Sequence, residues 1–142
     1  MKKALLEGRP RLAALLLAGG AACFVLLVLE GSGAAAQGEL PLPAMAHRDK
    51  LLHFGAHLWI TSLLLWGLAL LGSGPARGRV LRALAMALAL DLGAGLAIEL
   101  AQATMGAAHG RVFDMWDVAA NAAGALAAGG LFLVMALRLT RA

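Results

Sequence analysis

Three stretches of the chain carry polar side chains at the three- and four-residue spacing that places them on one face of a helix. The three polar stripes are Asp49, His53 and His57; then Asp91, Glu99 and Gln102; then Asp114, Asp117 and Asn121. Carboxylates, imidazoles and amides in such sets serve in general acid–base chemistry, metal binding and proton transfer. The stripes therefore indicate where the chemistry of this protein is done.

Glu99 is the first candidate for a catalytic group, because it lies inside an apolar run with Gln102 less than one turn away. A carboxylate shielded from water is suited to proton transfer near neutral pH. We predict Glu99 as general base and His53 as acid or as the group that orients it, with Asp117 beside them. The predicted substrate-binding residues are Arg48, Asp49, Lys50, Gln102, Arg111 and Asn121. The three cations among them would hold phosphate or carboxylate groups, Arg by its bidentate fork.

Other interpretations of the same residues stay open. Asp49, Lys50 and Asp114 also suit ordinary helix ends, where a carboxylate favours the helix dipole. Asn121 could be a hydrogen bonder in helix packing, and Asp91 could pair with a neighbouring helix.

His53 and His57 form an HxxxH pair, which could bind a metal ion with Glu99 or Asp117 as further ligands. The pair lacks the intervening Glu of a zinc-protease HExxH helix. We predict no metal and no cofactor. No phosphate-cradling glycine-rich loop or nucleophile elbow is present in the sequence either.

The composition points to helices in lipid. The chain has 142 residues, of which 61% are hydrophobic and 14% charged, and it contains 18 Gly. Soluble domains have roughly 45–50% apolar residues. A helix needs roughly 20 mainly apolar residues to cross a membrane, and the stretches that meet this need are about 12–29, 51–71, 80–105 and 115–137. We predict an all-α, polytopic membrane protein with one membrane domain and four transmembrane helices.

The distribution of charge predicts the orientation. Nine of the twelve Lys and Arg residues lie before the first span, between the second and third spans, or after the fourth. By the positive-inside rule these segments are cytoplasmic, as are both termini. The net charge of +4 is then a topology signal, and we expect no nucleic-acid partner. The polar stripes lie in the outer half of the membrane, except for Asp91, and should face one another because charge in contact with lipid is costly.

The first span has a second interpretation. Its basic start, apolar run and following small residues at 33–37 also resemble a cleavable signal peptide. Its length of about 18 apolar residues favours a retained helix. The segment 31–48 is expected to be an outer loop, either a lid or a simple tether.

Four pieces of sequence occur in a fixed order. They are Asp49-Lys50-Leu51-Leu52-His53-Phe54, Glu99-Leu100-Ala101-Gln102, Arg111 followed by Asp117, and Asn121 with Gly124. In this order the pieces resemble the pattern of the VanZ-like family of small bacterial membrane proteins, over residues of about 48–137. The resemblance implies functional positions at Asp49, Lys50, His53, Glu99, Gln102, Arg111, Asp117 and Asn121. His57 stands where that family usually has an aromatic residue, and Asp91 belongs to none of its motifs.

The function expected from these features is handling of a cell-envelope or lipid-linked anionic substrate by a bacterial inner-membrane protein, in an outward-facing polar pocket. The resemblance implies a link to glycopeptide tolerance. Whether the protein is an enzyme is left open. The alternatives are a small transporter or ligand-binding protein, and a structural membrane protein whose polar residues only lock the helices together.

Overall fold

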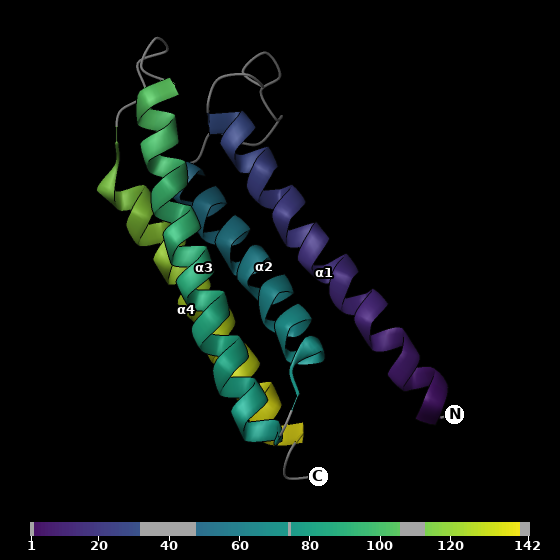
Figure 1. Cartoon of the computed structure of the whole chain (residues 1–142). Coiled ribbons are helices and arrows are strands. Elements are labelled where there is room, and N and C mark those ends of the chain that lie inside the picture. Colours follow the sequence, from purple (N-terminus) through teal and green to yellow (C-terminus); the bar gives the residue numbers. More distant parts are fainter. Residues whose placement is uncertain (1, 32–47, 74, 106–112, 140–142) are drawn as a thin grey trace.

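The computed structural model describes residues 2–31, 48–73, 75–105 and 113–139, and this part of the chain is helical throughout apart from short connections. The helices are α1 (Lys2–Gly31), α2 (Arg48–Leu71), α3 (Ala76–Met105) and α4 (Met115–Leu139). They run alternately up and down the bundle, so the start of α1 and the end of α4 lie at the same end (Figure 1). We name this the far end, and the end where α2 and α4 begin and α3 finishes the site end.

All four helices are long and apolar enough to cross a membrane, which indicates a multi-pass membrane protein. The predicted spans 51–71, 80–105 and 115–137 correspond to α2, α3 and α4. α1 begins ten residues before the predicted span 12–29 and continues through Pro10. The predicted span covers only the apolar residues, whereas the helix also includes the polar residues before them. The apolar part of α1, Arg9–Leu26, lies within three residues of the predicted span at each end.

The outward surface of the bundle is apolar. Large hydrophobic side chains remain exposed along every helix, among them Leu15, Trp59, Leu100 and Leu131, which are 71%, 61%, 53% and 60% exposed. A soluble protein of this size rarely leaves so many contiguous apolar side chains in water. This surface is the one that hydrocarbon would cover.

α2 is the central helix, in contact with α1, α3 and α4. Its closest approach is to α4 at Gly124, where an added Cβ would run into the backbone oxygen of Phe54 and lie 2.9 Å from the backbone nitrogen of Leu58. At Gly67 an added Cβ would lie 2.8 Å from the Leu17 side chain of α1. Small residues let membrane helices pack closely, and these two glycines set the distances of α4 and α1 from α2.

The half of the bundle toward the far end is filled by apolar side chains. Its fully buried members are Leu65, Ala83, Ala87, Ala128 and Phe132. The Trp66 and Phe132 rings meet edge to face, with centroids 5.1 Å apart and planes at 84°. The half toward the site end differs, because nearly all buried polar side chains lie in it or at its boundary with the apolar half.

The connection between α2 and α3 at the far end is short. The Gly72 backbone N–H donates to Leu68 O at 3.0 Å, which closes α2. The Arg82 guanidinium donates to Ser73 O at 2.5 Å and so fixes the connection to α3.

Candidate functional site

The first layer of the site is built around Lys50, in the first turn of α2. Its ammonium donates to Asp114 Oδ2 and to Asp117 Oδ1, each at 2.6 Å, and it lies 2.8 Å from Asp49 Oδ2. Three carboxylates from the starts of α2 and α4 thus surround one cation. The sequence-based role of Lys50 as a ligand for an anionic substrate is disfavoured by this arrangement, because its charge is already matched. Lys50 instead fixes the position of Asp117.

Asp114 lies just before α4, outside the membrane-spanning segment, and accepts two hydrogen bonds. The Lys50 ammonium lowers the pKa of the Asp114 carboxyl below its ordinary value, and the Trp116 backbone N–H acts in the same direction. The bond from Trp116 N to Asp114 Oδ1 is 2.7 Å long. Asp114 therefore caps α4 and stays ionised, which accounts for its presence without a catalytic role.

His53 lies one turn deeper than Lys50 and meets residues from both other helices. Its Nδ1–H donates to the Asn121 Oδ1 of α4 at 2.9 Å. Its Nε2 is 3.7 Å from Asp117 Oδ2, and its Nδ1 is 3.7 Å from Glu99 Oε1. With the proton on Nδ1, the Nε2 lone pair is free to accept a proton. The ring is therefore oriented by an amide and flanked by two carboxylates.

Glu99 is almost completely buried, with 1% of the residue exposed, in the last third of α3. Its Oε1 accepts no hydrogen bond within the described residues, although the His53 ring is near. A buried carboxylate oxygen without a donor is rare in proteins and costly. Such an atom is available to a ligand or to a proton.

The same three residues satisfy the spacing of a metal site. One ligating atom from each of His53, Glu99 and Asp117 can be chosen so that all lie within 4.8 Å of one another. A second group, formed by Asp49, Asp114 and Asp117, also satisfies it. That second group already encloses the Lys50 ammonium. The prediction that no metal is bound stays a prediction.

The two histidines of the HxxxH motif do not share one ligand. His57, one turn below His53, donates from Nδ1 to Asp91 Oδ2 of α3 at 2.9 Å. Both residues are 0% exposed. The structure thus pairs the two residues that depart from the VanZ-like pattern. Asp91 and His57 were singled out in the sequence, but their pairing was not predicted.

Gly95 of α3 makes room for this arrangement. An added Cβ there would lie 3.1 Å from His57 Cε1 and 3.3 Å from Asn121 Nδ2. The imidazole of His57 on α2 and the amide of Asn121 on α4 therefore both lie against α3 at Gly95. Gly95 lies one turn from both Asp91 and Glu99 along α3, and nothing in the sequence indicates this contact.

The three polar stripes face one another in the structure, as their spacing predicts. Among the predicted site residues, the structure brings together Asp49, Lys50, His53, Glu99, Asp117 and Asn121. Gln102 is buried, with 5% exposed, one turn from Glu99 on α3. The side chain of Arg48 and the whole of Arg111 lie outside the described residues.

Comparison with known proteins adds no relative. No family model, no curated protein and no solved structure matches this chain. The resemblance to the VanZ-like family stays a prediction based on its motifs.

Proposed function

We propose that this protein is a bacterial inner-membrane protein that binds or acts on a lipid-linked anionic substrate of the cell envelope at the site end of α2, α3 and α4. The observation that carries the proposal is the buried Glu99 Oε1, without a hydrogen bond among the described residues and 3.7 Å from His53 Nδ1. In this proposal Glu99 is the general base. His53, oriented by Asn121 and Asp117, is the acid once its Nε2 has taken up a proton.

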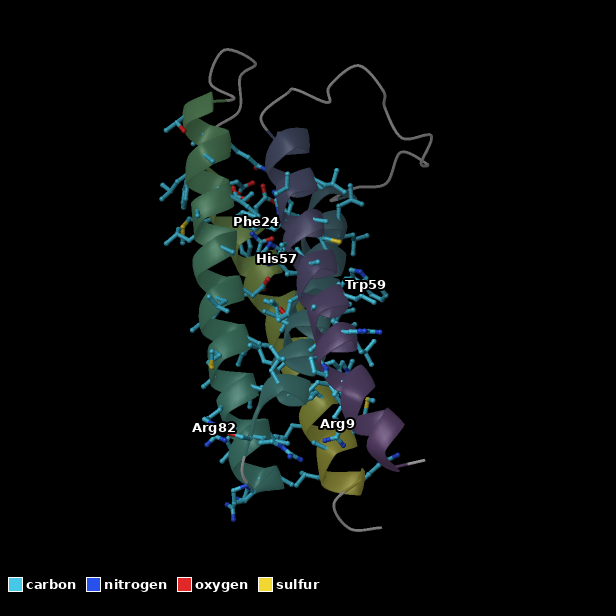
Figure 2. All side chains as sticks on the ribbon, turned by 45° about the vertical axis from the view of Figure 1, so that its right-hand side comes forward. Arg9, Phe24, His57, Trp59 and Arg82 are labelled. Carbon is cyan, nitrogen blue, oxygen red and sulfur yellow. The ribbon has the colours of Figure 1, made fainter. Side chains whose placement is uncertain are left out.

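The distribution of cations supports an outward-facing site. Arg9 and Arg82 lie at the far end, away from the level of His57 (Figure 2). Arg77, Arg79 and Arg138 belong to the ends of α3 and α4 at that same far end. The positive-inside rule assigns such an end to the cytoplasm. The site end then opens toward the cell envelope, and a VanZ-like role connected with glycopeptide tolerance is consistent with that.

The anionic part of the substrate needs cations other than Lys50, which is occupied by carboxylates. We assign that role to Arg48 and Arg111, which flank the site in sequence. A lipid-linked substrate also fits the surroundings of the site. The outer faces of the helices that form it are apolar, at Leu100 and Trp116 for example, and could contact the lipid chain of the substrate.

The second candidate function is a non-catalytic small transporter, favoured by the depth of His57 and Asp91. The apolar cluster around Leu65 and Phe132 closes the bundle below them, which favours a one-sided site.

The test uses purified protein in vesicles that contain a polyprenyl diphosphate as probe. We expect wild-type protein to retain the probe or to release phosphate from it. Glu99→Gln or His53→Ala should slow the release of phosphate at least about 100-fold, a typical loss for a general acid or base, and should weaken retention of the probe if the site only binds. Thr104→Ala is the matched control, because Thr104 is exposed on α3 and, within the described part of the chain, its hydroxyl donates to carbonyls of its own helix. Equal signals from wild type and both site variants would contradict the proposal.

A further inference from the structure

The far end of the bundle contains a hollow that all four helices line. Its volume is about 290 Å³, and we name it the far-end hollow. α1 leans away from the other helices toward this end (Figure 1). Trp66, Phe132 and Ala136 are among the apolar lining residues, and Arg9 and Arg79 are the two cationic ones. The hollow therefore combines apolar walls with two guanidinium groups.

The two arginines come from helices that are distant in sequence but lie at the same boundary. Arg9 is the first residue of the apolar segment of α1, and Arg79 lies in the first turn of α3. The stem of Arg79 packs at the end of α2, because an added Cβ at Gly72 would lie 3.3 Å from Arg79 Cγ. Both cations thus lie where the apolar segments meet the membrane surface.

No carboxylate in the described part of the chain matches these two charges. The ion pairs of the described residues are all formed by Lys50, His53 and His57, with acidic partners in the half toward the site end or at its boundary. Arg9 and Arg79 take part in none of them. Two guanidinium groups beside one hollow therefore favour an anion from outside the chain.

The start of α3 adds to the positive potential of the far-end hollow. A helix N-terminus carries a partial positive charge and favours acidic side chains in its first turn. α3 has no acidic residue there and carries Arg77 and Arg79 instead. Ala76, the first residue of α3, lines the hollow. The helix terminus and the arginines therefore favour an anion at the same place.

The apolar walls decide which kind of anion fits. A free phosphate ion gains nothing from apolar walls, whereas a phospholipid has its phosphate at the membrane surface and its chains in hydrocarbon. A second hollow of about 590 Å³ adjoins the first, since Ala76, Val80 and Ala136 line both. Two apolar spaces beside the cations match the two chains of a phospholipid.

A hollow of similar volume higher in the bundle lacks the cations. It measures about 250 Å³ between α1, α2 and α3, and Leu17, Phe24 and Leu90 are among its lining residues. No lysine or arginine is among the described residues that line it. The chain of any lipid can fill this hollow, whatever its headgroup. Of the two, the far-end hollow is the one that can select a lipid by its charge.

We propose that the far-end hollow binds an anionic phospholipid of the surrounding bilayer. Its phosphate lies between the guanidinium groups of Arg9 and Arg79, whose planar forks suit phosphate oxygens. One chain lies against Trp66 and Phe132. The lipid joins α1 to α3 at the end where α1 leans away from the bundle. The proposal concerns the end opposite Glu99 and does not rest on the proposed function.

The test measures lipid binding to the purified protein by native mass spectrometry in a neutral detergent. Phosphatidylglycerol is the anionic probe, and phosphatidylcholine is the neutral one. A cation at a membrane surface contributes about 1 kcal/mol to the binding of anionic lipid, so we expect wild type to prefer phosphatidylglycerol at least about ten-fold. Arg9→Gln and Arg79→Gln should each weaken that binding about five-fold and leave phosphatidylcholine binding unchanged.

Arg11→Gln is the matched control, because Arg11 is exposed on the same helix as Arg9 and does not line the hollow. It should change the affinity less than about two-fold. A loss as large as that of Arg9→Gln would reveal diffuse attraction to a charged surface and overturn the proposal. Equal binding of the two lipids, or displacement of phosphatidylglycerol by an equal concentration of inorganic phosphate, would also overturn it.

A further variant tests the place of the chain. Ala136→Phe keeps both arginines but fills the hollow, and it should weaken phosphatidylglycerol binding at least about five-fold because packed interiors leave no room for a second occupant. Ala123→Phe, at an exposed position of the same helix, is its control. Unchanged binding in Ala136→Phe with native helical content would contradict the proposal. If that variant does not fold, the arginine variants decide, because they add no bulk.

Discussion

The two halves of this bundle are built from the same helices but are held together by different forces. Toward the far end, Leu65, Ala128 and Phe132 pack without polar contacts. Toward the site end, His53 and His57 bond to α4 and α3 across the helix interfaces. In lipid an apolar side chain gains little by leaving hydrocarbon for a protein interior, so packing contributes chiefly through close contact. A buried ionisable group that loses its partner cannot be stabilised by contact with hydrocarbon. The polar half is therefore the half most sensitive to the loss of a partner.

The largest effect is expected at the closest contact between α2 and α4, which lies in the polar half. Gly124→Ala places a methyl group against the backbone of Phe54 and Leu58, and backbone cannot move aside as a side chain can. We expect the α2–α4 contact to open, with a loss of more than about 4 kcal/mol of stability and most of the monodisperse protein.

Gly130→Ala is the control for this change, because an added Cβ at Gly130 meets nothing within 4 Å. It should leave the protein as stable as wild type or raise its stability by up to about 1 kcal/mol, through the better helix propensity of Ala. Thermal unfolding in detergent compares the two variants. Equal midpoints would show that the close approach of α2 and α4 is not needed.

The next effect tests the polar half. His57→Leu leaves the Asp91 carboxylate buried without its partner, and we expect a loss of about 3 kcal/mol. The double variant His57→Leu with Asp91→Leu should recover at least half of that loss, because no buried charge remains. A double variant as unstable as the sum of the single variants would show that the pair acts through the packing of its atoms rather than through charge.

The smallest effect belongs to the apolar half. Phe132→Ala removes the edge-to-face contact with Trp66 and leaves a cavity. Such a change costs roughly 3–5 kcal/mol in a soluble core, and we expect a smaller loss of about 2 kcal/mol here because lipid also solvates the apolar side chain when the bundle opens. Leu131→Ala, at a side chain that is 60% exposed, should change the stability by less than about 0.5 kcal/mol. Denaturation of both variants in mixed micelles gives the comparison. A loss for Phe132→Ala larger than that for His57→Leu would reverse the ranking of the two halves.

Much of this architecture could be predicted from the sequence. The runs of apolar residues predicted the four helices. The spacing of polar residues such as Asp49, His53 and Glu99 predicted which helix faces meet. The partners could not be predicted, because spacing along one helix fixes a face but not the depth or rotation of the neighbouring helix. His57 therefore could not be assigned to Asp91, nor could Lys50 be recognised as the counter-ion of three carboxylates instead of a ligand for an anion.

The position of α2 in the chain has a consequence for biogenesis. α2 carries Lys50 and His57, but His57 meets its carboxylate 34 residues later, and Lys50 meets its partners on α4 64 and 67 residues later. During synthesis α2 thus leaves the ribosome with a cation and an imidazole that have nothing to bond to from the other helices. Release of α2 alone into lipid is disfavoured until α3 and α4 have been made. The helices that form the site are therefore expected to leave the insertion machinery together, as one preassembled unit.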